Sequence, residues 1–227
     1  MILCTANIGR TKMTADRVEA DMRKIKSTFR GGAIIGWQEI DEADQADEHA
    51  ILRRVYRDYY ENIAMETRTP ISVFQGYEVE RSRVIHATGG IPHVSPHRVI
   101  TEALIRYRRK SPPIVVLNMH YPPGAFNKKI EKTQKQREEH WAEMFEKHQD
   151  RLKYWADERG LTTFWMGDVN RQKMPKAHPR ERQLVTQGID SISVVVRSTK
   201  VDVVRRGVID LNSDHNARYV KVNLDAR

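Results

Sequence analysis

The chain of 227 residues has the length of one fairly large domain, and it carries 39 Lys and Arg against 30 Asp and Glu, a net charge of +9. The single cysteine, Cys4, excludes an intramolecular disulfide, and no apolar run approaches the roughly 18 residues of a membrane span. Excess positive charge predicts attraction to polyanions, most often nucleic acid, although an inert basic surface has the same composition. We therefore expect a monomer of one domain, residues 1–227, in the reducing cytoplasm.

The first part of the chain predicts alternating strands and helices. Residues 2–8 are a short apolar run typical of a strand. A helix is expected next, with apolar residues at helical spacing and two glycines at its end: Val18, Met22, Ile25 and Phe29, then Gly31 and Gly32. Residues 33–37 have the composition of a buried strand, and residues 43–59 predict a second helix.

From Pro70 onward the pattern is mainly that of strands. One long helix is expected over about 127–159, where apolar residues recur every three or four positions until Gly160. The strands are expected at 71–74, 77–85, 99–107, 114–120, 162–166, 192–196, 201–205 and 218–224, with a loop at 86–97. Strands and helices that mix without strict alternation predict an α/β sandwich of four layers, α/β/β/α, in which two mixed sheets pack face to face and helices cover them.

Acidic, amide and imidazole residues cluster at the ends of these strands. They are Asn7, Glu39, Asn118, His120, Asp168, Asn170, Asp190, Asp214 and His215. Strand ends in a packed sheet converge on one rim, so these groups are expected to meet, and clustered carboxylates repel one another unless a cation joins them. Oxygen donors without cysteine favour Mg²⁺, Mn²⁺ or Ca²⁺ over structural zinc. Any one of these residues taken alone is more typical of a turn after a strand, and it is their number and order that favour a site.

The order of these residues resembles the successive motifs of the endonuclease/exonuclease/phosphatase superfamily, which includes deoxyribonuclease I. The matching motifs are Asn7, Trp37-Gln38-Glu39, Asn118-Met119-His120, Gly167-Asp168-Val169-Asn170, Gly188-Ile189-Asp190 and Ser213-Asp214-His215. The resemblance runs through nearly the full chain and implies a deoxyribonuclease I-like fold that hydrolyses phosphoesters with Mg²⁺, or with Mn²⁺ as a substitute.

The resemblance also implies a role for each residue. Glu39 would ligate the metal with Asn7 and Asp214 close by, and Asp168 and Asn170 would orient or deprotonate the attacking water. His215 would contact the scissile phosphate with Asp190 as its carboxylate partner. His120 would act on the opposite side of the phosphate, and Asn118 would contribute to substrate binding. A metal and donor side chains suit this chemistry because in-line attack builds negative charge on the non-bridging oxygens.

The residue type at position 120 helps to distinguish the branches of the superfamily. The abasic endonucleases tend to have an amide at this position, whereas deoxyribonuclease-like, phosphatase and sphingomyelinase branches have histidine. A carboxylate usually supports this histidine, and Glu66 and Glu78 are both candidates.

A basic segment follows Asn170 and is expected to leave the catalytic rim as a loop. Its cations are Arg171, Lys173, Lys176, Arg180 and Arg182, and we interpret Arg171 and Lys173 as substrate-binding residues that track phosphates. The alternative is that these cations are solvated on a surface loop and bind no substrate. His86, His93 and His97 lack the spacing of a zinc site.

Three functions remain open from the sequence. The leading hypothesis is a Mg²⁺-dependent nuclease that cuts DNA or RNA. The alternative is a phosphatase or phosphodiesterase for a small or lipid-linked phosphate that uses the same residues. A binding module without activity is disfavoured, because the residues that carry the chemistry are all present.

Overall fold

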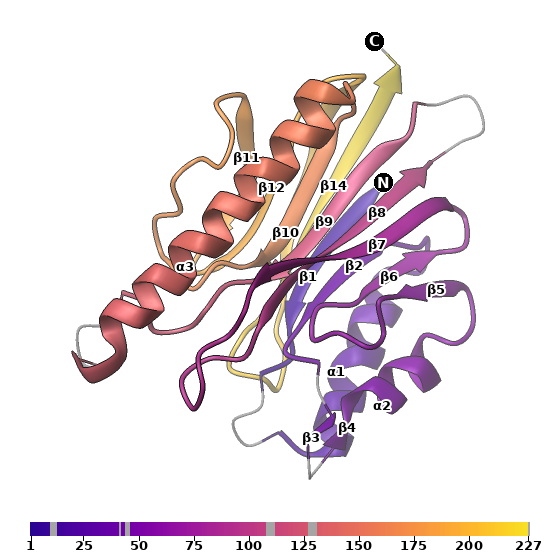
Figure 1. Ribbon diagram of the computed structural model, residues 1–227. Helices are drawn as coiled ribbons and strands as arrows, with labels where there is room; N and C mark the ends of the chain where they lie inside the picture. The colour runs from indigo at the N-terminus through magenta and orange to yellow at the C-terminus, as the bar shows by residue number, and fades with distance from the viewer. Residues whose placement is uncertain (10–12, 41, 44–45, 108–111, 127–130, 227) are drawn as a thin grey trace.

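Two six-stranded sheets packed face to face form the centre of the molecule, with helices on the outside (Figure 1). The computed structural model describes residues 1–9, 13–40, 42–43, 46–107, 112–126 and 131–226. The first sheet has the order β13 (Thr199–Ile209), β14 (Ala217–Ala226), β1 (Ile2–Asn7), β2 (Ile34–Gln38), β6 (Ile71–Phe74) and β5 (Tyr60–Ile63). The second has the order β11 (Glu181–Gln187), β12 (Asp190–Val195), β10 (Thr163–Asp168), β9 (Ile114–His120), β8 (Arg98–Arg106) and β7 (Glu78–Thr88).

Each sheet contains one pair of parallel strands, and that pair lies at the centre of its sheet. In the first sheet β1 runs parallel to β2, and in the second β9 runs parallel to β10. The other neighbouring strands of both sheets are antiparallel. The carboxyl ends of each parallel pair therefore lie side by side, which matters for the site described below.

Three hydrophobic clusters fill the three spaces between the four layers. The cluster between the sheets takes alternate residues of the central strands, such as Leu3, Ile34, Val116 and Phe164. The residues between them point outward, because successive side chains of a strand face opposite sides of a sheet. Outward residues of the first sheet pack against α1 (Ala15–Thr28) and α2 (Glu48–Val55), and those of the second against α3 (Glu131–Leu152). The predicted four-layer sandwich is confirmed.

The helix α1 matches its prediction closely. The side chain of Thr14 accepts a hydrogen bond from the backbone N–H of Arg17 and caps the first turn. Val18, Met22 and Ile25 are fully buried on one face. The helix ends at Thr28, before the two glycines.

Prediction and structure differ at several element boundaries. The helix expected at 43–59 is shorter, because Asp47 accepts from the N–H of Ala50 at 2.8 Å and caps the helix there. A small hairpin, β3 (Glu42–Ala43) and β4 (Ala46–Asp47), precedes it. Two further strands were not predicted, β5 and β11, and the second occupies the end of the expected basic loop.

The long helix is interrupted near its end. Residues 127–130 of its expected range lie outside the described part of the chain, and the final turns, Lys153–Glu158, are π-helical rather than α-helical. Trp141 and Trp155 are among the apolar residues that recur every three or four positions along the expected helix, and both are buried. None of the helices in the described ranges has the length and apolar composition needed to cross a membrane.

Candidate active site

The polar residues predicted from the strand ends meet at one rim of the sandwich. Asn7 ends β1 and Glu39 follows β2, while His120 and Asp168 are paired neighbours at the ends of β9 and β10. Asp190 begins β12 and pairs with Asp168 across the antiparallel ladder. The site is therefore assembled by both sheets, from the ends of parallel strands and the start of an antiparallel one.

Asp168 lies at the centre of this group. Its Oδ2 accepts a hydrogen bond of 2.9 Å from the amide of Asn7, which joins the two sheets, and its Oδ1 accepts one of 2.8 Å from the backbone N–H of Asn170. The carboxylate is almost completely buried. Burial and the neighbouring charge of Asp190 raise the pKa of Asp168 to about 7, although His215 and the two hydrogen bonds oppose the shift.

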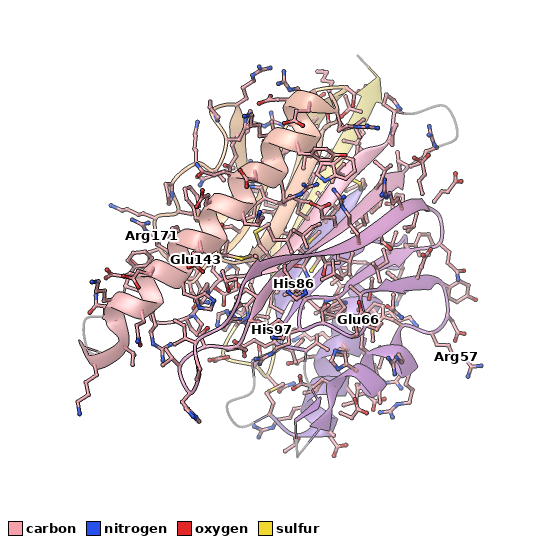
Figure 2. All side chains as sticks on the ribbon, viewed as in Figure 1. Arg57, Glu66, His86, His97, Glu143 and Arg171 are labelled. Carbon is pink, nitrogen blue, oxygen red and sulfur yellow. The ribbon has the colours of Figure 1, made fainter. Side chains whose placement is uncertain are left out.

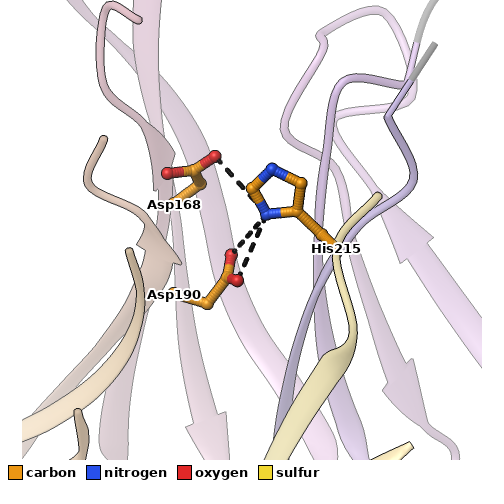
Figure 3. A group of neighbouring side chains, drawn as sticks. All are labelled: Asp168, Asp190 and His215. Atoms are coloured by element: carbon orange, nitrogen blue, oxygen red, sulfur yellow. Dashed lines mark hydrogen bonds and ion pairs between the residues drawn. The ribbon is translucent and has the colours of Figure 1, made fainter. Parts of the chain in front are cut away.

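His215 and Asp190 form a pair beside Asp168 (Figure 3). The Nδ1 atom of His215 lies 3.2 Å and 3.4 Å from the two carboxylate oxygens of Asp190 and 3.9 Å from Oδ2 of Asp168. Burial opposes the charged imidazolium, but the hydrogen bond and charge of Asp190, with the charges of Asp168 and Asp214, outweigh it. The pKa of His215 is raised to about 9, so the ring is a cation at neutral pH.

The loop that carries His215 is tied to the first sheet. The hydroxyl of Ser213 donates to the backbone carbonyl of Asn7 at 3.1 Å, and it accepts from the N–H of His215 at 3.2 Å. Asp21 of α1 is fully buried and accepts from the backbone N–H groups of Asn212 and Ser213. Sequence reasoning did not identify Asp21, whose position within a helix gives no sign of a contact with residues about 190 positions later.

His120 lies on the other side of Asp168. Its Nε2 is 3.5 Å from Oε1 of Glu39 and 3.7 Å from Oδ2 of Asp168. Its Nδ1 faces a guanidinium, with Nη1 of Arg98 at 3.1 Å. Burial, followed by the charges of Arg98, Arg68 and His215, holds the pKa of His120 well below its usual value.

The carboxylate partner expected for His120 is wrong. Glu78 lies opposite Arg106 in the register of β7 and β8, at the far end of these strands, and Glu66 is an exposed residue that makes no contact with His120 among those described. Arg98 takes the place of the carboxylate. The sequence contained a weak signal for it, since Arg98 opens an apolar strand directly after the His-rich loop.

Glu39 and Asp214 approach the same rim. Glu39 directly follows β2 with a φ of +61°, an unusual backbone conformation for a non-glycine residue, and its side chain is about one-quarter exposed. Asp214 is exposed, and its Oδ1 lies so close to Gly9 that any Cβ at that position would overlap it. The N–H of Gly9 in turn donates to Oδ1 of Asn7 at 2.9 Å.

Asn118 has a different position from the one expected for a substrate-binding residue. It is fully buried, and its amide nitrogen lies within hydrogen-bond distance of three backbone carbonyls, those of Trp37, Thr69 and Pro70. Its Oδ1 accepts from Gln38 at 2.6 Å. The whole amide is used to join the two sheets, which leaves no polar atom of Asn118 for a substrate.

Arg171 and Lys173 line a groove of about 700 Å³ that begins at Asn170 (the basic groove); its other walls are Gly124, Phe126, Gln172 and Ile189. The guanidinium of Arg171 lies 4.3 Å from the ring centre of Phe126, whose side chain is 43% exposed. The same guanidinium lies 5.1 Å from the ring centre of Trp141 of α3, and Figure 2 shows Arg171 near the middle of that helix. Arg182 belongs instead to β11 and donates to the carbonyl of Val201, so the phosphate-tracking prediction does not extend to it.

Within the described residues one group could hold a metal through His, Cys, Asp or Glu atoms: Asp168, Asp190 and His215, whose ligand atoms lie within 4.8 Å of one another. However, Nδ1 of His215 is already bonded to Asp190, so a metal on that atom would break the pair. The metal ligands expected from the sequence, Glu39, Asn7 and Asp214, all offer oxygen atoms, which a hard cation prefers. His86, His93 and His97 form no such group in this part of the chain.

Solved structures of other proteins share the fold of this chain. No protein-family model matches the sequence, and no curated protein matches it. A mannosyl-6-phosphatase from Bacteroides thetaiotaomicron superposes with a TM-score of 0.72 over 98% of this chain and 99% of its own, at 12% identity. An endonuclease/exonuclease/phosphatase from Bacteroides vulgatus gives 0.72 over 99% and 98%, at 16% identity. Truncated TDP2 from Caenorhabditis elegans gives 0.71 over 96% of each chain, at 14% identity. The chain therefore has the deoxyribonuclease I-like fold that its motifs predicted.

Proposed function

We propose that the chain is a divalent-metal-dependent hydrolase of phosphodiester bonds and that its substrate is nucleic acid. One observation carries the proposal: a single carboxylate, Asp168, contacts Asn7 of the other sheet and lies within 4 Å of both His120 and His215. A buried carboxylate between two imidazoles is an arrangement suited to handling protons and phosphate charge.

Mg²⁺, or Mn²⁺ in its place, would be held by Glu39 with Asn7 and Asp214. The fit rests on the donors: all three offer oxygen, and the one cysteine, Cys4, is buried in a hydrophobic cluster. The excess of carboxylates also supports a cation, since the charge of Asp190 raises the pKa of Asp168 and Glu39 lies 3.5 Å from His120 on the same rim. When bound, the metal would neutralise charge on the phosphate and polarise the bond to phosphorus.

The side chains of this protein would then divide the remaining work. Asp168 accepts a proton from the attacking water, a role suited to a carboxylate whose pKa is near 7, and Asn170 helps to orient that water. The His215 imidazolium, held by Asp190, donates to a non-bridging phosphate oxygen where negative charge accumulates. His120 approaches the phosphate from the Glu39 side.

The nucleic-acid substrate is supported by charge and by the basic groove. The net charge of +9 favours a polyanion. Arg171 and Lys173 extend this charge away from Asn170, and the exposed ring of Phe126 offers a surface on which a base can stack. A polymer that crosses the rim would place one phosphate at Asp168 and the next nucleotide in the groove.

A phosphatase for a small or lipid-linked phosphate is the second candidate. It is favoured by one observation, the match over nearly its full length to a mannosyl-6-phosphatase. A groove of about 700 Å³ is also large enough for a sugar phosphate.

The two candidates are separated by substrate. The protein is incubated with plasmid, single-stranded DNA, RNA, a sugar phosphate and a small aryl phosphodiester, each with Mg²⁺ or with chelator. We expect cleavage of a nucleic acid that needs the metal and disappears in Asp168→Ala. The matched control is Asp150→Ala, which removes an exposed carboxylate of α3. Turnover of the sugar phosphate alone would select the second candidate, and equal turnover by Asp168→Ala and the parent protein would overturn both.

A further inference from the structure

We infer that Arg98 is a positioning residue that holds His120 as the neutral tautomer with its proton on Nε2. His120 would then present an N–H donor to the phosphate. The use of that donor in catalysis rests on the proposed function, but the tautomer does not. The inference starts from the finding that this histidine has a cation where a carboxylate was expected.

The position of Arg98 is closely defined. It is the first residue of β8, it pairs with Thr88 of β7, and only 5% of it is exposed. One guanidinium nitrogen, Nη1, lies 3.1 Å from Nδ1 of His120, and the other, Nη2, lies 3.3 Å from the hydroxyl of Ser95. A guanidinium has five N–H donors and no acceptor. Nδ1 of His120 must therefore be the acceptor in this contact, and a neutral ring then carries its proton on Nε2.

The groups near Nε2 favour the same tautomer. The carboxylate oxygens of Glu39 and Asp168 lie 3.5 Å and 3.7 Å away, and both are acceptors that attract an N–H. One neighbour opposes it, because the amide nitrogen of Asn170 lies 3.1 Å from Nε2. The Asn170 amide can instead donate to the backbone carbonyl of Tyr121 at 2.9 Å, so it does not need Nε2 as an acceptor. The guanidinium of Arg98 can only donate, so it does need Nδ1 as an acceptor. A charged donor also makes the stronger hydrogen bond, so the demand of Arg98 prevails.

The consequence is a difference in role between the two histidines. His215 has a carboxylate on Nδ1, which holds its proton there and favours the cation. His120 has a cation on Nδ1, so it is neutral and can only donate a hydrogen bond through Nε2. A neutral imidazole does not release that proton, because an imidazolate would have to form. His120 would thus stabilise charge on phosphate oxygen without protonating the leaving group.

The tautomer is measured directly by long-range ¹H–¹⁵N NMR on the ¹⁵N-labelled full chain, without metal or substrate. The two ring nitrogens of a neutral histidine have well-separated ¹⁵N shifts, and the spectrum of His120→Gln identifies the signals that belong to this ring. We expect a protonated Nε2 and an unprotonated Nδ1 in the parent protein. A protonated Nδ1 would overturn the inference, whatever the activity of the protein.

Variants of Arg98 then test its part in holding the tautomer. Arg98→Met removes the donor and is expected to bring Nδ1-protonated ring into the spectrum. Arg98→Gln restores a neutral donor and should return the signals toward those of the parent. The matched control is Arg151→Met, since Arg151 is a partly buried arginine bonded to Glu102 elsewhere on the second sheet. The same His120 signals in Arg98→Met as in the parent would show that Arg98 does not set the tautomer.

Kinetics with a cleaved substrate provide a second measurement. If the donor acts on the transition state, Arg98→Met lowers kcat about 10- to 100-fold, the usual range for a group that orients a ligand, and changes KM much less. Arg98→Gln should recover most of kcat. A change confined to KM would show that Arg98 acts on substrate binding and would overturn the positioning role.

Discussion

The buried imidazole of His148 makes the stability of this fold sensitive to acid. His148 lies on α3 and is fully buried, with its Nδ1 2.8 Å from the hydroxyl of Tyr121 and its ring against Trp165. Burial lowers the pKa of His148 from 6.5 to about 3. In the unfolded chain the same ring has its ordinary pKa, so below pH 6.5 the unfolded state takes up a proton that the folded state does not.

The direction and size of the effect follow from this difference. The stability contributed by His148 is constant above pH 6.5 and is lost as the pH falls from 6.5 toward 3. The slope reaches about 1.4 kcal/mol per pH unit. Between about pH 7.5 and about pH 5, the proton linkage of this one residue reduces the free energy of unfolding by about 2 kcal/mol.

Urea unfolding at these two pH values, followed by tryptophan fluorescence in buffer with chelator, measures the loss. The variant is His148→Gln, whose amide can accept from Tyr121 without titrating. We expect the parent to lose about 2 kcal/mol more than the variant on acidification. His86→Gln replaces an exposed histidine and should behave like the parent. An equal loss in His148→Gln and the parent would refute the reasoning, because the other titrating groups are common to both.

Three further predictions concern the site and its support. Asn118→Ala should reduce the free energy of unfolding, measured by urea unfolding, by roughly 2–4 kcal/mol, because buried backbone carbonyls lose their hydrogen-bond donor. The variant should leave KM unchanged. A large rise in KM with unaltered stability would restore the substrate-binding role. Asp190→Asn should lower kcat at least about 10-fold through loss of the carboxylate that holds His215, and an unchanged kcat in steady-state assays would contradict this. Gly167→Ala should lower the stability to urea by about 1–3 kcal/mol, because a Cβ would overlap the carbonyl of Met119 on the neighbouring strand; parent-like stability would show that the strands can separate.

The part of the site that was predictable is the part carried by strand ends. Asn7, Glu39, His120 and Asp168 each follow a run of apolar residues, and the structure brings them to one rim because β1 and β2, like β9 and β10, are parallel pairs. Apolar runs are visible in sequence since buried strands need them. Which strands lie next to each other is not visible in the sequence. Here the arrangement was inferred from the resemblance, which rests on the order of the motifs.

The residues that were missed, or assigned another role, act through long-range contacts that leave no local pattern. Arg98 contacts His120, and Asp21 binds a loop at the other end of the chain. Asn118 carries the same polar signal as its neighbours, yet its side chain faces the first sheet rather than the rim. Alternation along β9 places Asn118 and His120 on the same face of the strand, so only the packing of the two sheets separates a structural amide from a site residue.

The surroundings of Asp168 explain why two histidines in one site can do different chemistry. The same carboxylate oxygen, Oδ2, lies 3.7 Å from His120 and 3.9 Å from His215, so the rings share one anion. Their outer partners have opposite charge, since Arg98 contacts one ring and Asp190 the other. Burial, followed by the charges of Arg98, Arg68 and His215, lowers the pKa of His120. For His215 the hydrogen bond and charge of Asp190 outweigh burial, and the pKa is raised. A phosphate between them would meet a neutral donor on one side and a cation on the other, and this asymmetry comes from the deep burial of His120 together with the opposite charges of the two outer partners.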